Sequence, residues 1–290
     1  MTTPRVLPTL VLHGGVCSRL PGPDYRQRGE ETLRAALAAG MAVLTTGGSA
    51  LDAVQVAVTT MEDSGVLNAG RGAVRDAEGC VLLDAMLMDG ITAKIGSVAG
   101  VQRVRNPIAL ARAVLERTAH VLMIGGGAER LADQLDLERV MDAYFGAPPP
   151  DQPLAHGTVG AVALDVHGHL AAATSTGGTT AKLPGRVGDS PLAGAGTWAD
   201  DVCAVSATGV GEFFIRCGFA HRVAWAVAAG FTVDEATKTA LQRVMELGGW
   251  GGAIALTSQG IISMPYSGAG MWRAHQRSDG EVFIACGSDG

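Results

Sequence analysis

The residues best suited to chemistry lie in the middle of the chain, where Gly157 and Thr158 precede an apolar run over 159–164. A threonine hydroxyl is a poor nucleophile at neutral pH unless a base lies beside it. An N-terminal threonine supplies that base itself, because a free α-amino group has a pKa of roughly 7.7–8.0. A cut between Gly157 and Thr158 would therefore place the nucleophile and its base on one residue.

Gly157 favours such self-cleavage, because a residue without Cβ can adopt strained backbone angles. The hydroxyl of Thr158 could then approach the carbonyl carbon of Gly157. Attack there would give an ester by an N→O acyl shift, and water would hydrolyse that ester. The alternative interpretation is that Gly157-Thr158-Val159-Gly160 only begins a strand, and so short a motif does not decide between the two.

Further polar residues lie downstream in glycine-rich turns. Thr176 follows one short hairpin after Thr158, and Arg186 stands three residues before Asp189. A guanidinium can bind an α-carboxylate bidentately and a carboxylate can bind an α-ammonium, so the last two suit a zwitterionic amino acid. A simple Arg–Asp surface pair is the alternative. Thr208 and Gly209 lie between a predicted strand and helix, where a hydroxyl and backbone N–H groups could hold an oxyanion.

The elements that must position these residues alternate apolar strands with amphipathic helices. Strands are predicted at 10–12 (ending at a Gly14-Gly15 turn), 81–90, 121–124 (short and buried), 159–164, 169–175, 202–206, 253–256, 261–264 and 282–285, the last three completing one sheet. Helices are predicted at 25–43, from 51, from 107, at 212–229 and at 233–247. This pattern suggests helices covering a sheet-on-sheet core.

A single domain over 1–290 is expected, because the strands predicted in either half of the chain do not make a complete sheet. The one clear linker covers about 145–157 and contains Pro148, Pro149 and Pro150. Consecutive prolines cannot continue a helix or a central strand. An accessible segment before the scissile bond would suit self-cleavage, although an ordinary linker would look the same.

Composition excludes several classes of protein. The net charge of −6 and the lack of a basic run disfavour a nucleic-acid partner. No apolar run approaches the roughly 18–20 residues of a membrane helix, and the N-terminus is a poor secretory signal. The five cysteines are scattered without CxxC spacing, so neither a disulfide framework nor a zinc site is indicated. A reducing cytoplasm is the expected compartment.

Ordered motifs along most of the chain are similar to those of the plant-type L-asparaginase / isoaspartyl peptidase family, which are threonine N-terminal-nucleophile (Ntn) hydrolases. These motifs are His13-Gly14-Gly15, Leu51-Asp52-Ala53-Val54, Asn68-Ala69-Gly70, Leu83-Asp84-Ala85, Met88-Asp89-Gly90, Arg105-Asn106-Pro107, 120–125, 156–165, 172–178, 183–191, Thr208-Gly209 and Gly211-Glu212. The resemblance implies an α+β fold, a four-layer αββα sandwich, cut into an α subunit (1–157) and a β subunit (158–290).

The resemblance also implies a role for each candidate residue. Thr158 would be the nucleophile, oriented by Thr176, and Asn68 would position its new amine. Thr208 and Gly209 would form the oxyanion hole. The substrate-binding residues would be Arg186 and Asp189, with the carbonyl of Gly211 assisting at the substrate amine.

The implied substrates are L-asparagine and β-aspartyl dipeptides, with no metal or organic cofactor required. Some relatives carry a structural sodium ion in the loop corresponding to Met61 to Gly72, held by backbone carbonyls. A dimer of cleaved αβ units, which is a heterotetramer, is usual in the family. Val210 replaces a common threonine, and Val16-Cys17-Ser18 departs from the usual turn, which bears on substrate preference and cleavage rate.

Three other functions fit parts of the same pattern. A glycosylasparaginase would share the nucleophile and the pair Arg186 and Asp189, which we call the clamp. It normally acts after secretion or in lysosomes. A threonine protease of the same fold is another enzyme class. An uncleaved and catalytically silent relative would act as a binding or structural protein. Two fragments separating between Gly157 and Thr158 would distinguish the enzymes from this last alternative.

Overall fold

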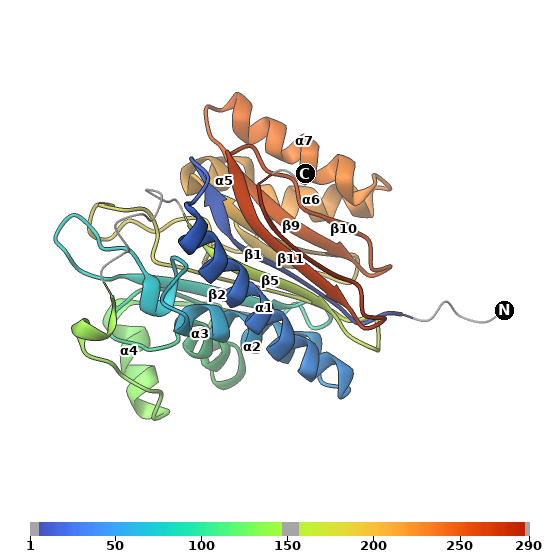
Figure 1. Cartoon of the computed structure of the whole chain (residues 1–290). Coiled ribbons are helices and arrows are strands. Elements are labelled where there is room, and N and C mark those ends of the chain that lie inside the picture. Colours follow the sequence, from blue (N-terminus) through green and yellow to red (C-terminus); the bar gives the residue numbers. More distant parts are fainter. Residues whose placement is uncertain (1–5, 147–156, 288–290) are drawn as a thin grey trace.

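The computed structural model describes residues 6–146 and 157–287. The predicted linker therefore lies mostly outside the described residues. The chain forms an α+β structure in which two β-sheets lie face to face and helices cover their outer faces (Figure 1). The predicted α+β class is confirmed.

The larger sheet has eight strands in the order β12-β11-β1-β5-β6-β2-β3-β4, and all neighbours are antiparallel except β3 and β4. Its strands are β1 (Thr9–Cys17), β2 (Leu83–Asp89), β3 (Ile95–Val101), β4 (Leu122–Ile124), β5 (Val159–Leu164), β6 (Leu170–Thr176), β11 (Gly270–Arg277) and β12 (Val282–Cys286). The smaller sheet has the order β10-β9-β8-β7, formed by β7 (Thr197–Ala199), β8 (Cys203–Gly209), β9 (Gly251–Thr257) and β10 (Ile262–Ser263).

Helices lie on the two outer faces of this pair of sheets. α1 (Pro23–Thr45), α2 (Ala50–Asp63) and α3 (Pro107–Arg117) pack on the larger sheet, and α6 (Phe219–Ala228) and α7 (Val233–Glu246) pack on the smaller one (Figure 1). The chain also forms α4 (Gly125–Gln134), α5 (Gly211–Cys217) and the 3-10 turns η1 (Gly70–Gly72) and η2 (Asp142–Tyr144). Separate buried apolar clusters fill the space under each helical layer and between the sheets.

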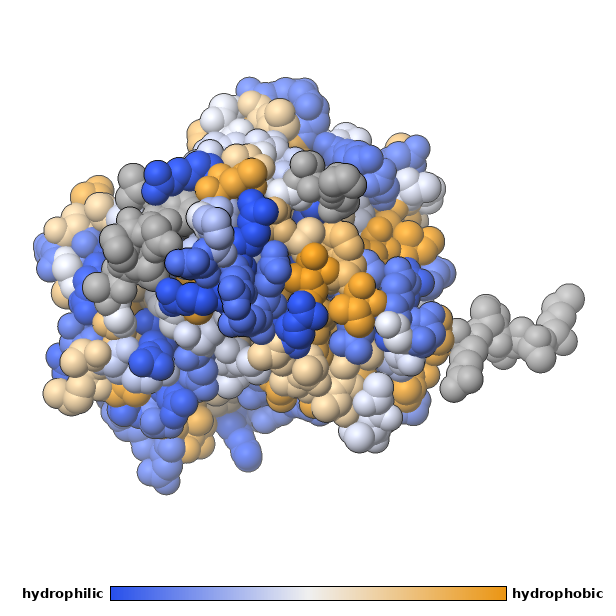
Figure 2. Space-filling view, viewed as in Figure 1, coloured by the Kyte–Doolittle hydropathy of each residue, from blue (hydrophilic) through white to orange (hydrophobic). Residues whose placement is uncertain are grey.

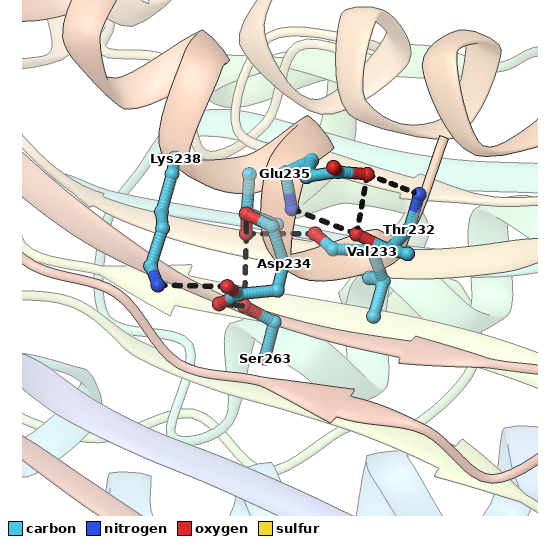
Figure 3. Close-up of polar contacts among 7 residues, drawn as sticks. Thr232, Val233, Asp234, Glu235, Lys238 and Ser263 are labelled. Carbon is cyan, nitrogen blue, oxygen red and sulfur yellow. Dashed lines mark hydrogen bonds and ion pairs between the residues drawn. The ribbon is translucent and has the colours of Figure 1, made fainter.

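Side-chain caps fix where the helices begin. The Ser49 hydroxyl caps α2 by accepting from the Asp52 N–H. Thr232 and Glu235 form a reciprocal capping box at α7. Figure 3 shows that Asp234, in the first turn of α7, accepts from Lys238 of the same helix and from Ser263 of β10. The bond from Ser263 ties the outer helix to the edge of the smaller sheet.

The register of the larger sheet positions the candidate site. Val159 of β5 pairs with Ser175 of β6, so Thr158 and Thr176 meet at the same end of the hairpin. Asp84 of β2 pairs with Thr176 on its other side. β1 runs along the opposite edge of β5, where His13 pairs with Gly160.

Two predictions for the N-terminal half are wrong in detail. β1 does not end at a Gly14-Gly15 turn but continues to Cys17 through a bulge, at which Gly15 adopts a φ of +104°. A bulge bends a strand without ending it. Glycines at a bulge therefore give the same sequence pattern as glycines in a turn. The segment 121–124 is not buried, because β4 is an edge strand, and Ile124 is 66% exposed.

Two predictions for the C-terminal half are also wrong. The helix predicted at 212–229 is broken by Gly218, whose left-handed φ of +60° ends α5 before α6 begins. The segment 282–285 does not join 253–256 in one sheet, because it becomes β12 of the larger sheet by pairing with β11. The sequence analysis missed β11, since its C-terminal half carries polar residues rather than an apolar run.

None of the helices within the described residues is both long and apolar enough to span a bilayer. Figure 2 shows polar and apolar residues interspersed over the viewed face, with the apolar residues in small groups.

Candidate active site

The hydroxyls of Thr158 and Thr176 lie beside each other beneath the protein surface. The Thr158 Oγ1 donates to the Thr176 Oγ1 at 3.2 Å, and both residues are buried. The Thr176 Oγ1 also accepts from the Gly178 N–H at 2.9 Å and donates to the Gly157 carbonyl oxygen at 3.0 Å. Thr176 thus connects the hydroxyl of residue 158 to the carbonyl of the residue before it.

Asn68 approaches the same carbonyl from the loop that follows α2. Its side-chain amide donates to the oxygens of Gly157 and Gly178, both at 2.7 Å, and its Oδ1 accepts from the Val74 N–H at 2.9 Å. The Gly157 carbonyl therefore receives one donor from Asn68 and one from Thr176. Fixed donors at a carbonyl oxygen stabilise the negative charge that develops when a nucleophile attacks the carbon.

The backbone of β1 passes directly against the Gly157–Thr158 bond. A Cβ added to Gly15 would lie 3.0 Å from the Gly157 Cα and 3.1 Å from the Thr158 nitrogen. Gly15 also has a positive φ, which residues other than glycine rarely adopt. The bulge in β1 consequently requires glycine where it meets the predicted cleavage site.

A buried polar chain that the sequence analysis missed runs between the two sheets. The His13 Nδ1 lies 3.1 Å from the Thr158 carbonyl oxygen, and its Nε2 lies 2.9 Å from the Ser206 Oγ. The chain continues through Thr174 and Thr197 to the carbonyl of Ser190. Burial lowers the pKa of His13 to about 3, so the imidazole is neutral at pH 7. Its Nδ1 must then carry the proton to donate to the carbonyl, and its Nε2 accepts from Ser206.

The signal that could have revealed this chain is the presence of polar residues within otherwise apolar strands. His13, Thr174 and Ser206 are fully buried in β1, β6 and β8. A buried polar side chain requires a hydrogen-bond partner, so several on neighbouring strands indicate a network. The sequence alone does not show which of them face one another.

Arg186 and Asp189 lie close together but do not form the simple surface pair that was considered. Arg186 binds the carboxylate of Glu212 bidentately, with Nε–Oε1 and Nη2–Oε2 distances of 2.9 and 3.0 Å. Asp189 is buried, and its Oδ2 has no hydrogen-bond partner within the described structure. Burial raises the pKa of Asp189 to about 7, although the nearby Arg186 charge opposes that shift.

A pocket with an empty volume of about 220 Å³ joins the threonine pair to these charged groups. Gly157, Thr158, Thr176, Arg186, Asp189 and Gly209 are among the residues that line it. The remaining predicted site residues, Asn68, Thr208 and Gly211, surround it without lining it. Gly211 lies so near the clamp that an added Cβ would be 2.6 Å from the Asp189 Oδ1.

Thr208 is fully buried at the end of β8, where its Oγ1 accepts a long hydrogen bond of 3.4 Å from the Val16 N–H. Val210, which replaces a common threonine, is the N-cap of α5 and provides no side-chain cap. Its own N–H donates to the Trp250 carbonyl. The backbone of this turn is therefore held in place without the missing hydroxyl.

Two buried charges behind the clamp were not predicted to have a role. The Asp84 Oδ1 accepts from the Gly100 N–H at 2.8 Å, and the Lys182 Nζ donates to the Leu82 carbonyl at 3.0 Å. Burial raises the pKa of Asp84 and lowers that of Lys182, while the charge of each opposes the shift of the other. Their opposite charges favour mutual stabilisation close to Arg186.

The segment from Met61 to Gly72 begins in the last turn of α2, where it carries the buried carboxyl group of Glu62. The Glu62 Oε1 accepts from the Ser175 hydroxyl at 2.6 Å and from the Ile108 N–H at 3.2 Å. Burial raises the pKa of Glu62 to about 8. No group of three or more His, Cys, Asp or Glu side chains within 6–146 and 157–287 could hold a metal ion. A sodium ion bound by backbone carbonyls stays a prediction.

The fold and the pocket together describe an α+β protein in which buried threonine hydroxyls face a small pocket lined by charged side chains. Comparison with known proteins specifies the class further. A sequence model of the family described as asparaginase matches residues 6–150 and 146–284. This chain belongs to the asparaginase family of hydrolases, and the resemblance inferred from the motifs is confirmed.

Relatives from several organisms match over most of their length. An isoaspartyl peptidase of Salmonella typhimurium is 41% identical, covering 91% of this chain and 94% of the relative. An isoaspartyl peptidase of Escherichia coli is 44% identical, covering 84% of each chain. A plant-type L-asparaginase of Pyrobaculum calidifontis is 40% identical, covering 91% of this chain and 95% of the relative.

Proposed function

We propose that this chain is an Ntn hydrolase with the αββα sandwich of that class, which cuts itself between Gly157 and Thr158. The β subunit then begins at Thr158, which hydrolyses the side-chain amide of L-asparagine, of β-aspartyl dipeptides, or of both. The names of the relatives support these substrates. The chain carries the residues of the expected site within one small pocket and its wall.

One observation carries this proposal: the Gly157 carbonyl oxygen accepts from Asn68 at 2.7 Å and from Thr176 at 3.0 Å. These donors are fixed where an oxyanion would form if the Thr158 hydroxyl attacked the Gly157 carbon. The hydroxyl of Thr158 is already hydrogen-bonded to the hydroxyl of Thr176, which in turn binds that carbonyl. A strand that merely began at Thr158 would not need two side-chain donors on the preceding carbonyl.

Self-cleavage begins when the Thr158 Oγ1 attacks the Gly157 carbonyl carbon. A C–O bond forms, and Asn68 and Thr176 stabilise the oxyanion. The proton lost from the Thr158 hydroxyl passes to the amide nitrogen as the C–N bond breaks, which leaves an ester and a free amine on Thr158. Water hydrolyses the ester and releases the carboxylate of Gly157. The new α-amine has a pKa of roughly 7.7–8.0 and supplies the base that threonine otherwise lacks.

Hydrolysis of substrate uses the same hydroxyl a second time. Arg186 exchanges Glu212 for the substrate α-carboxylate, while Asp189 and the carbonyl of Gly211 bind the α-ammonium. The side-chain amide then lies over Thr158, and an aspartyl ester forms as ammonia or an amino acid leaves. Thr208 and the Gly209 N–H stabilise the oxyanion, and water releases aspartate. No metal or organic cofactor enters these steps.

Three further features form part of the proposal. The whole chain, 1–290, is one domain whose subunits, 1–157 and 158–290, remain together after cleavage. The active form is a dimer of such αβ units. A sodium ion held by backbone carbonyls of the Met61 to Gly72 loop stabilises the region around Asn68.

Intact mass spectrometry combined with steady-state kinetics tests the proposal. The purified 29.6 kDa chain should separate into two fragments whose new ends are Gly157 and Thr158. Cleaved protein should release aspartate from L-asparagine or β-Asp-Leu. A fully active, uncleaved chain would overturn the mechanism. A strong preference for N-glycosylated asparagine would replace the proposed substrate with that of a glycosylasparaginase.

A further inference from the structure

The buried imidazole of His13 joins the main chain of Thr158 to the smaller sheet. Its Nδ1 lies 3.1 Å from the Thr158 carbonyl oxygen, and its Nε2 lies 2.9 Å from the Ser206 Oγ. The proposed scissile bond lies immediately before Thr158, so cleavage would remove the covalent restraint on the N-terminal side of this residue. Its main chain would then be held from the C-terminal side, where the carbonyl contacts His13.

Strand register creates the space for this contact. His13 of β1 pairs with Gly160 of β5, and Gly160 pairs with Thr174 of β6, so the three residues form one row across the larger sheet. Ser206 of β8 meets this row from the smaller sheet. A Cβ added to Gly160 would overlap with both the His13 Nε2 and the Ser206 Oγ. The imidazole and the serine can therefore meet only because residue 160 has no side chain.

The hydroxyl groups around this row fix the orientation of the imidazole proton. Thr197 of β7 pairs with Ser206 and donates to the Thr174 Oγ1 at 2.6 Å, and the Thr174 Oγ1 lies 2.7 Å from the Ser206 Oγ. Because His13 is neutral at pH 7 and its Nε2 accepts, Ser206 uses its one hydrogen on His13 and accepts from Thr174. The chain thus stabilises the tautomer whose Nδ1–H is directed at the Thr158 carbonyl.

The far end of this hydroxyl chain is also bound. Thr197 has one hydrogen, which it shares between the Thr174 hydroxyl and the Ser190 carbonyl at 2.9 Å. Apolar residues such as Met86 and Ile254 fill the same layer between the sheets. A polar group without a partner in such a layer is unfavourable, so the chain is held in the geometry that satisfies its members. The imidazole at its end is correspondingly rigid.

The strand that binds His13 also carries the proposed oxyanion donor. Ser206 and Thr208 are two residues apart on β8, so their side chains point to the same face of the strand. The Thr208 Oγ1 in turn accepts from the Val16 N–H of β1 at 3.4 Å. The contact between His13 and Ser206 therefore sets the position of Thr158 relative to the strand that would stabilise the oxyanion.

We propose that His13 is a positioning residue for the mature nucleophile: after cleavage it holds the main chain of Thr158 in line with the oxyanion donor Thr208. This inference rests on the proposed function. His13 is not among the residues that line the pocket, so its loss should lower kcat and leave KM unchanged. Before cleavage the peptide bond to Gly157 also holds Thr158, so self-cleavage should depend on His13 much less than turnover does.

Two conservative variants separate this role from a purely structural one. In His13→Asn the amide nitrogen takes the place of Nδ1 and can still donate to the Thr158 carbonyl. In His13→Gln the longer side chain places its amide near Ser206 instead. We expect cleaved His13→Asn protein to retain most of the wild-type kcat, and His13→Gln to lose roughly 10–100-fold in kcat at unchanged KM. A residue that only joined the two sheets would give the reverse order.

Steady-state release of aspartate from L-asparagine and β-Asp-Leu measures kcat and KM, and intact mass measures cleavage. His275→Gln is the matched control, because His275 lies on the neighbouring strand β11 and its ring stacks on Phe283. It should change neither constant. A wild-type kcat in both His13 variants would overturn the inference and leave the proposed function intact. An inactive wild-type chain would overturn both.

A measurement on the wild-type protein keeps the inference testable if the His13 variants fold poorly. In protein labelled with ¹⁵N-histidine, NMR distinguishes a protonated ring nitrogen from an unprotonated one. The His13 ring, assigned through the backbone of β1, should carry its proton on Nδ1 at pH 7. A proton on Nε2 would leave no donor facing the Thr158 carbonyl and would overturn the inference.

Discussion

The candidate site has two halves: the cleavage half around Gly157 and Thr158, and the clamp half formed by Arg186 and Asp189. Their polar groups are hydrogen-bonded in different ways. Around Gly157 and Thr158, the side chains of Asn68 and Thr176 are hydrogen-bonded to groups of the chain itself. In the clamp, Arg186 is bound by Glu212, and the buried Oδ2 of Asp189 has no partner among residues 6–146 and 157–287. The polar groups of the cleavage half are therefore bound within the chain, whereas the clamp half presents charged groups to the pocket.

The difference has an energetic meaning. A buried carboxylate without a full set of partners is unfavourable, which is why the pKa of Asp189 rises to about 7. A shift of about three units corresponds to roughly 4 kcal/mol in the balance between the two protonation states. A substrate ammonium would offset that cost.

The largest effect is expected from Thr158→Ala, which removes the nucleophile of both reactions. The variant should remain a single 29.6 kDa chain, and kcat should fall by up to about 10⁶-fold, as for other enzymes that lose a nucleophile. Intact mass and aspartate release measure the two effects. Thr158→Ser retains the hydroxyl and should retain cleavage. A Thr158→Ala chain that still splits before residue 158 would contradict the mechanism.

Thr208→Ala should separate the two reactions. Its hydroxyl is assigned to the oxyanion of substrate hydrolysis, whereas Asn68 and Thr176 bind the carbonyl of Gly157. Cleavage should therefore proceed normally while kcat falls by roughly 10²–10³-fold. Asn68→Ala is the matched variant and should slow cleavage. If Thr208→Ala blocks cleavage as well, the two halves share one oxyanion site.

Asp189→Asn should weaken substrate binding, because an amide cannot pair with the substrate ammonium as a carboxylate does. Loss of a charge-assisted hydrogen bond worth about 1.5–3 kcal/mol predicts a rise in KM of roughly 10–100-fold. In the wild type, kcat/KM should rise with pH through about 7, as Asp189 ionises. The variant should lack that step, and an unchanged pH profile would show that Asp189 does not bind the ammonium.

The same substitution should stabilise the fold in a pH-dependent way. The folded pKa of Asp189, about 7, exceeds its value in the unfolded chain, which is about 4. Between these values the folded state holds a proton that the unfolded state has lost, so wild-type stability falls as pH rises through this window. The gain in Tm from Asp189→Asn should therefore be near zero at pH 4 and largest above pH 7. Thermal unfolding at several pH values measures it.

Local sequence signals predicted the parts of the fold in which each residue has one dominant preference. The strands at 159–164 and 169–175 are short apolar runs around a turn, and they form β5 and β6. The helix predicted from Pro107 begins there. β11 lacked such a signal, because it contains Arg273, His275 and Arg277, and Arg273 is itself buried. The break at Gly218 depends on one backbone angle that composition does not reveal.

The candidate site divides in the same manner. The hairpin register places Thr158 next to Thr176, so their proximity could be inferred from two strands and a turn. The pairing of Arg186 with Glu212 depends on how the start of α5 packs against a loop 26 residues earlier in the chain. His13 and Ser206 meet only because two sheets stack. Contacts between layers are set by packing, and a single sequence carries no direct record of them.

The smallest predicted effect concerns the interaction between Glu212 and the clamp. Glu212 occupies the Arg186 guanidinium in the manner expected of a substrate carboxylate. Because Glu212 is about half exposed, with 54% of its side chain accessible, the pair should contribute about 1 kcal/mol or less. Glu212→Gln should lower KM up to roughly 5-fold at unchanged kcat, by removing a competitor for Arg186. Glu246→Gln, which breaks an exposed Arg–Glu pair away from the pocket, is the control. A higher KM in Glu212→Gln would show that Glu212 instead orients Arg186 for the substrate, and the clamp would then be preorganised like the cleavage half.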